Sequence, residues 1–191
     1  MLLLKTIALP YLHNNATLDS MLKTRYNIHI VSAARSLYLK LVAYEIECGM
    51  FGAIRKYDIH TGLDFYCANR SIVASISNGV VVDIYQFTGK AVGSPWWNNT
   101  YAIVISTDNY DIVYGEICKH TFVNLGDTIS AGDLIGTVTP VLKTDKGVTP
   151  TSMLHMEVYK RGLFRRHVIW HIGEDTPPGL YDPSCLFTGM V

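Results

Sequence analysis

Two histidines and one aspartate are the side chains in this sequence best suited to hold a metal ion. His60 and Asp64 are separated by three residues, and His155 lies far along the chain in a strand-like segment. Two neutral imidazoles and one carboxylate suit zinc, and three protein ligands leave a fourth position for water. Gly62 would let the chain between the first two ligands turn sharply, so that both face one ion. The spacing alone is weak evidence, because a histidine in a strand is more often a hydrogen-bonded residue than a ligand.

The segments around these side chains are predicted to form antiparallel strands. From Gly49 onward, short runs of Val, Ile, Thr and Tyr alternate with Gly, Asn, Asp and Pro, which is typical of strands joined by turns. We therefore expect a mainly β fold, either a sheet or a barrel, spanning residues 49–191. The predicted strands are 72–76, 80–85, 101–106, 111–117, 134–138, 153–159 and 167–171.

Residues 1–48 are predicted to form an N-terminal extension with one helix. Apolar side chains recur at helical spacing over residues 30–46. The polar face of this helix carries few basic residues, which favours packing on the main domain over binding to a membrane surface or a partner. Residues 1–12 are apolar but lack a basic start, so we do not expect a secretory signal peptide.

Composition argues against several other classes of function. Sixteen basic and sixteen acidic side chains cancel, so nucleic acid is not an expected partner. Hydrophobic residues make up 49% of the chain, but no run of about eighteen apolar residues is present, so no transmembrane segment is predicted. The four cysteines lack the spacing of a zinc finger or a thioredoxin-type site. We expect buried free thiols, and the even number also permits two disulfides.

The neighbourhood of the three candidate ligands resembles the lysostaphin/LytM family of zinc endopeptidases over most of the chain beyond residue 48. Residues 60–64, with the sequence HTGLD, look like the first ligand motif of that family, and residues 154–157, with LHME, look like the second. Between them, residues 123–136 match the glycine-punctuated hairpin of the family in spacing and order. Three motifs in register are far more specific than any one of them.

This resemblance implies a lysostaphin-type domain, also called a duplicated hybrid motif, with an open groove and one zinc ion per chain at its floor. It implies a metallopeptidase that hydrolyses peptide bonds of bacterial peptidoglycan or its stem peptides. Such a protein would be bacterial or phage-borne and would act at the cell envelope, outside the cell or from a virion. A wall-directed enzyme without a secretory signal would fit a virion-associated or lysis protein. The metal ligands that it implies are His60, Asp64 and His155.

The chain departs from the family at two positions beside the metal. The family has a histidine in a Tyr-x-His element, where this chain has Tyr114-Gly115-Glu116. A second histidine opens the His-x-His motif of the family, and Met153 stands there in this chain. The predicted ligands are therefore present while the two neighbouring histidines are replaced.

Strand alternation predicts what these replacements do. Residues two apart on a strand point to one face, so Tyr114 and Glu116 are expected to face the same groove as His155. Glu116 would then take a proton from activated water as the general base, with Tyr114 or Tyr159 steadying the oxyanion. Met153 has no titratable proton and cannot replace a histidine. The alternative is a catalytically silent zinc-binding domain that binds the cell wall or a partner protein. A purely structural interpretation of Glu116 is that it pairs with Lys119 or a nearby hydroxyl.

Three aromatic residues are candidates for substrate binding. Trp96 and Trp97 are adjacent in a predicted loop, and both cannot be buried on one face, so at least one is expected to be exposed. An exposed indole on a groove wall can stack on sugar or peptide, although a tryptophan that caps the core explains the pair equally well. Tyr159, on the strand of the second ligand motif, is the third candidate.

Overall fold

The computed structural model describes residues 47–144 and 151–187, so the helix predicted at residues 30–46 lies outside the described residues. Nine strands and three short 3-10 helices make up the regular structure of the described part. The strands are β1 Leu63–Tyr66, β2 Ile72–Ala74, β3 Gly79–Thr88, β4 Thr100–Ser106, β5 Tyr110–Ile117, β6 Thr128–Ile129, β7 Leu134–Thr137, β8 Met153–Lys160 and β9 Leu180–Tyr181. The 3-10 helices are η1 Glu47–Gly49, η2 Lys90–Val92 and η3 Pro183–Leu186.

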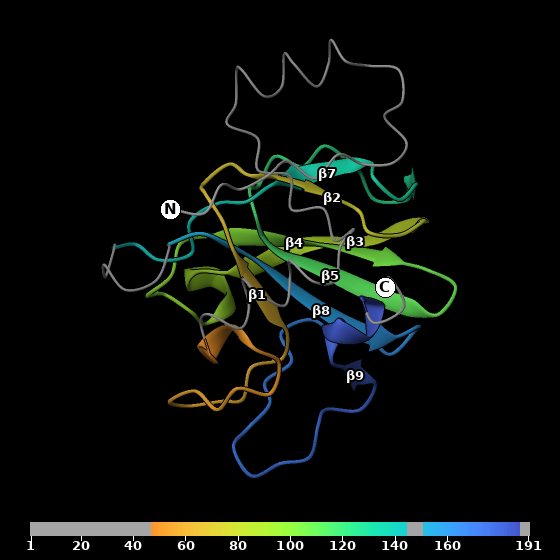
Figure 1. Ribbon diagram of the computed structural model, residues 1–191. Coiled ribbons are helices and arrows are strands. Elements are labelled where there is room, and N and C mark those ends of the chain that lie inside the picture. The colour runs from red at the N-terminus through yellow and green to blue at the C-terminus, as the bar shows by residue number, and fades with distance from the viewer. Residues whose placement is uncertain (1–46, 145–150, 188–191) are drawn as a thin grey trace, which may run out of the picture.

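Most of these strands form one open sheet with the order β1-β8-β5-β4-β3-β6, and β9 pairs with β8 (Figure 1). A second sheet consists of β2 and β7, which lie above the large sheet in Figure 1. Neighbouring strands in both sheets run antiparallel. The predicted mainly antiparallel β fold is confirmed, with sheets that stay open rather than close into a barrel.

The predicted strands agree with the structure except at one place. Six of the seven predicted segments contain a strand, but residues 167–171 form a loop with a single bridge between Trp170 and Ile59. His167 has a left-handed backbone with φ of 56°, which interrupts an extended chain. The strands β1, β6 and β9, which have two to four residues, were not predicted.

The two faces of the large sheet bury different clusters. The main core packs on one face and includes Leu154 and Met156 of β8. A smaller aromatic cluster lies on the other face and contains Tyr85, Tyr159 and Trp170. Because successive side chains of a strand point to opposite faces, His155 lies on the face of the smaller cluster. The candidate metal site therefore lies on the face opposite the main core.

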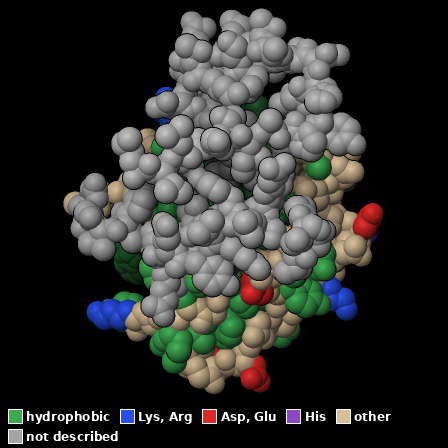
Figure 2. Space-filling view, viewed as in Figure 1, with side chains coloured by type: hydrophobic (Ala, Val, Ile, Leu, Met, Phe, Trp, Pro, Cys, Tyr) green, Lys and Arg blue, Asp and Glu red, His purple; other side chains and the backbone are tan. Residues whose placement is uncertain are grey.

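The part of the surface that Figure 2 shows has no dominant charge. On the face drawn in Figure 2, the visible Lys, Arg, Asp and Glu side chains are scattered among apolar ones and gather into no patch of one sign. None of the helices in the described ranges has the length and apolar character needed to cross a bilayer. All four cysteines lie in described segments, and no two of them are joined by a disulfide. The expectation that they are buried is wrong, because Cys48 and Cys185 are exposed and Cys67 and Cys118 are half-buried.

Candidate metal centre

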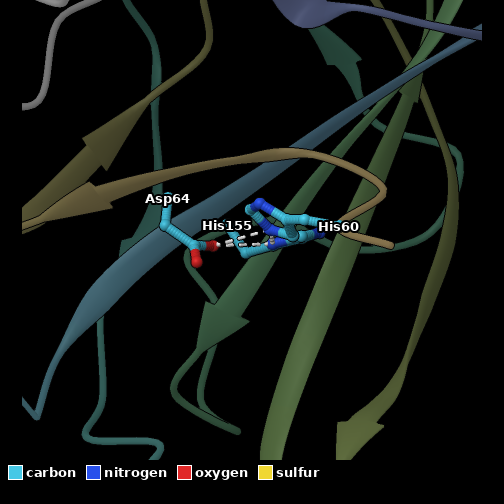
Figure 3. Close-up of side chains that lie close together, drawn as sticks. All are labelled: His60, Asp64 and His155. Carbon is cyan, nitrogen blue, oxygen red and sulfur yellow. Dashed lines mark hydrogen bonds and ion pairs between the residues drawn. The ribbon is translucent and has the colours of Figure 1, made fainter. Parts of the chain in front are cut away.

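Strand pairing brings two of the three candidate ligands together. In the antiparallel register of β1 and β8, Asp64 is directly opposite His155, and paired residues of this kind project to the same face. His60 precedes β1 in a short loop that returns its imidazole toward the other two (Figure 3). The structure therefore assembles the three side chains that the sequence pattern had selected.

The three ligand atoms form a small triangle. His60 Nε2 lies 3.1 Å from His155 Nδ1, and Asp64 Oδ1 lies 2.8 Å from His155 Nδ1 and 3.2 Å from His60 Nε2 (Figure 3). Two ligands of a tetrahedral zinc ion with bonds of about 2.0 Å are separated by about 3.3 Å. The donor set and its spacing thus fit one zinc ion.

Each ligand is held by a further contact at its other polar atom. The carbonyl oxygen of Met50 accepts a hydrogen bond from His60 Nδ1 at 2.8 Å, which leaves Nε2 as the ligand atom. His155 Nε2 lies 3.2 Å from Glu157 Oε1, which leaves Nδ1. Second contacts of this kind orient imidazole ligands in metal sites.

Arg55 fixes the carboxylate ligand, Asp64. Its Nη2 donates to Asp64 Oδ2 at 2.6 Å and to the carbonyl oxygen of Cys48 at 2.8 Å. Asp64 Oδ1 therefore remains on the side of the histidines. Arg55 was not predicted as a site residue, and no local pattern in the sequence marks it.

The electrostatics of the site favour a bound cation. Burial raises the pKa of Asp64, but attraction to His60 and hydrogen bonds from both histidines outweigh it and hold the pKa far below its usual range. Burial lowers the pKa of His155, but hydrogen bonds to Asp64 and Glu157 outweigh it and raise the pKa to about 10. Burial also lowers the pKa of His60. Two carboxylates beside His155 thus stabilise a positive charge between the histidines.

The ligands are buried, whereas an open groove was expected. The exposed fractions of His60, Asp64 and His155 are 3%, 2% and 6%. Phe87 covers part of the site, because its ring centroid lies 5.3 Å from that of His155.

A cavity of about 620 Å³ lies elsewhere in the described part, and none of the predicted site residues lines it. Its lining includes Arg70, Cys118, His120 and Phe122.

Gly62 lies at a bend between the first two ligands, as predicted, and it also serves close packing. It is absent from the glycines with a left-handed backbone. A Cβ atom at this position would collide with the carbonyl oxygen of Met156 and lie 2.8 Å from the His155 ring. The first ligand loop can therefore approach β8 only because this residue has no side chain.

Glu116 reaches the face of the metal site through an irregularity in β5. The register between β4 and β5 shifts beside Glu116, whose backbone is left-handed with φ of 61°. An extra residue of this kind interrupts strict alternation. The expectation that Tyr114 and Glu116 share a face is therefore wrong, since Tyr114 packs in the main core while Glu116 interacts electrostatically with His155 and Asp64.

The environment of Glu116 suits a proton acceptor. Burial raises its pKa to about 7, while a hydrogen bond with Thr100 and the charge of His155 oppose this rise. Within the described segments, its Oε2 atom is buried and has no hydrogen-bond partner. An unpaired carboxylate oxygen is expensive to bury, which points to a polar ligand of this atom.

The two predicted tyrosines do not reach a substrate. Tyr114 is fully buried, and its hydroxyl accepts a hydrogen bond from the backbone N–H of Ile76 at 3.0 Å. Tyr159 is 1% exposed, and its hydroxyl donates to Glu157 Oε2 at 3.0 Å. Sequence alternation placed Tyr159 on the correct face but could not show that other residues cover it. Both tyrosines are therefore internal residues, whereas the sequence had predicted that they face the groove.

The adjacent tryptophans lie beside the strand of Glu116. Trp96 is 62% exposed, and Trp97 is half-buried. Trp97 forms a bridge with Leu142, in a segment whose Thr139 N–H donates to the carbonyl oxygen of Glu116 at 2.9 Å. The prediction that at least one indole is exposed is confirmed, and their contact with substrate stays a prediction.

The chain is similar to known proteins in sequence and in structure. Residues 58–166, a range that contains all three candidate ligands, match the model of peptidase family M23. No curated protein matches the chain. One similar solved structure is the catalytic domain of a mutant of EnpA, a prophage-encoded M23 protein from Enterococcus faecalis, with 23% identity, coverage of 58% of this chain and 75% of that chain, and a TM-score of 0.43.

Two further solved structures are similar. The catalytic domain of lysostaphin, an antimicrobial peptidase from Staphylococcus simulans, is 19% identical, with 59% of this chain and 75% of that chain covered and a TM-score of 0.42. CbpA from L. salivarius REN is 20% identical, with 76% and 87% covered and a TM-score of 0.49.

Proposed function

The chain belongs to peptidase family M23, and from this premise we propose that it is a zinc-dependent peptidase that hydrolyses peptide bonds of bacterial peptidoglycan. The observation that carries the proposal is the triangle of His60 Nε2, Asp64 Oδ1 and His155 Nδ1, whose sides are 2.8 to 3.2 Å. These three atoms would hold the ion. Zinc, when bound, polarises a carbonyl and lowers the pKa of water toward about 7.

Glu116 is the proposed general base. Its pKa of about 7 places the carboxylate near the optimum for accepting a proton at neutral pH. The free Oε2 atom is the acceptor, and the hydrogen bond with Thr100 holds the side chain in place. Glu116 would later return the proton to the amine of the cleaved bond.

The exposed Trp96 is proposed to bind the substrate. Its loop is tied to the segment beside Glu116 by Asn98, whose Nδ2 donates to the carbonyl oxygens of Pro140 at 3.0 Å and Leu142 at 3.2 Å. This attachment ties the backbone of the loop to the segment that contacts Glu116. An aromatic surface of this kind suits a sugar or peptide strand of the wall.

Digestion of purified peptidoglycan tests the proposal. The wild type is expected to release soluble fragments with new amino termini, and Glu116→Gln to release at least about a hundredfold less, because the amide cannot accept the proton. Asp175→Asn, which removes an exposed carboxylate on a loop, is the control and should act like the wild type. Release by Glu116→Gln at the rate of the wild type would eliminate Glu116 as the base.

A silent zinc-binding domain is the second candidate, and the observation in its favour is Met153. Met153 lies on the same face of β8 as His155 and can offer no strong hydrogen bond to a substrate there. No fragment release by a wild type that holds one zinc per chain would support this candidate. Binding of the intact chain to insoluble peptidoglycan would then separate a wall-binding role from a protein-binding one.

A further inference from the structure

A buried carboxylate beside the candidate metal ligands is not used in the proposed chemistry. Glu157 is 5% exposed and lies on β8, two residues beyond His155 and two before Tyr159. The three side chains share one face of the strand. A carboxylate in such a place is costly unless several hydrogen bonds compensate it.

Three side chains donate hydrogen bonds to Glu157. Thr61 Oγ1 donates to Oε1 at 2.6 Å, and His155 Nε2 lies 3.2 Å from the same oxygen. The Tyr159 hydroxyl donates to Oε2 at 3.0 Å. Both carboxylate oxygens are therefore fixed, and the carboxylate cannot rotate without breaking at least one of these bonds.

The partners of Glu157 belong to both ligand-bearing segments. Thr61 lies in the loop between His60 and Asp64, whereas His155 lies on β8. Glu157 thus connects the loop of the first two ligands to the third. The same contact selects the protonated Nε2 of His155 and leaves Nδ1 to face the other ligand atoms.

We propose that Thr61, Glu157 and Tyr159 form a positioning chain that sets the zinc affinity of the site. The inference rests on the proposed zinc site but is independent of peptidase activity. Glu157 orients the His155 ring and increases its basicity, and the two hydroxyls hold Glu157. These residues act through His155 and touch neither the substrate nor the ion. Tyr159, which the sequence pattern assigned to substrate binding, has this different role.

Competition with a chelator of known affinity measures the zinc dissociation constant of each variant of the full chain. Glu157→Gln is expected to weaken zinc binding by about 10- to 100-fold, as is typical when the partner of a histidine ligand is lost. Thr61→Val and Tyr159→Phe are expected to weaken it several-fold, and Thr61→Ser, which keeps the hydroxyl, to restore the wild-type value.

Tyr85→Phe is the matched control for Tyr159→Phe. Both tyrosines are buried in the smaller cluster, but the Tyr85 hydroxyl has no hydrogen-bond partner among the described residues. Its removal should leave the zinc dissociation constant unchanged. The free energy of unfolding of each metal-free variant shows whether a loss of affinity reflects a loss of fold.

The possible outcomes separate this inference from the proposed function. Zinc dissociation constants within twofold of the wild type for Glu157→Gln, Thr61→Val and Tyr159→Phe would overturn the positioning chain alone. A wild type that binds zinc but cleaves no peptidoglycan would overturn only the proposed function. A wild type that binds no zinc would overturn both.

Discussion

At the scale of single residues, Glu116 combines a functional advantage with a cost in stability. Burial raises its pKa from 4.5 to about 7. In the metal-free chain, the folded state therefore keeps a proton that the unfolded state has already lost between these two values. Stability then falls as the pH rises through this range, because the folded state binds more protons than the unfolded state. The same carboxylate that suits proton transfer thus opposes folding above neutral pH.

Substitution of Glu116 should reveal this cost. For the metal-free chain, we expect the free energy of unfolding of Glu116→Gln to exceed that of the wild type by roughly 3 kcal/mol above about pH 8, and the difference to vanish below about pH 4. Urea denaturation across this pH range measures both values. Parallel pH profiles for the two proteins would show that the pKa of Glu116 is not raised by folding.

At the scale of elements, the contact of Phe87 from β3 with Gly115 of β5 decides how His155 is covered. Asp64, His155 and Gly115 are neighbours across β1, β8 and β5. Phe87, near the end of β3, fills the space above Gly115, where a Cβ atom would lie 2.8 Å from the aromatic ring. The missing side chain of Gly115 therefore allows the Phe87 ring to pack against His155.

Gly115→Ala is expected to displace the Phe87 ring toward His155. The overpacking should lower the free energy of unfolding by about 1–3 kcal/mol and weaken zinc binding. Because the added methyl group would meet the Phe87 side chain, the additional substitution Phe87→Leu should recover much of the lost stability.

Gly62→Ala offers the contrast. Its methyl group would meet the backbone carbonyl of Met156, so no side-chain substitution should rescue it. Thermal unfolding and zinc titration of the single and double variants measure these effects, and an additive double variant would contradict the steric explanation.

At the scale of the whole molecule, a zinc ion would join segments that are remote in the chain. His60 lies just before the edge strand β1, Asp64 lies on β1, and His155 lies on the neighbouring strand β8, which also pairs with β5. Because the folded state assembles this site and the unfolded state does not, metal binding is coupled to folding.

Zinc should therefore stabilise the fold in a concentration-dependent way. At a hundredfold excess of free zinc over the dissociation constant, the gain is about 2.7 kcal/mol, which raises the Tm of a domain of this size by about 5–10 °C. Calorimetry with increasing zinc and after chelation measures the shift, and metal analysis should find one zinc per chain. His60→Ala should show neither effect, and an equal zinc response in this variant would contradict the ligand assignment.

The residue types that could bind a metal were readable in the sequence, and so were most of the strands. His60, Asp64 and His155 stand in short motifs, and the strand residues alternate over long enough runs to be recognised. These are local properties of the chain, which is why the predicted β fold and the choice of the three side chains agree with the structure.

Only the tertiary structure decided how these residues meet and what surrounds them. The pairing of Asp64 with His155, the contact of Arg55 with Asp64 and the cover of Phe87 all join segments distant in sequence. The irregularity at Glu116 turned its side chain away from the face of Tyr114, which alternation could not foresee. The physical reason is that register, strand irregularities and burial depend on the partner strand, and no single strand contains that information.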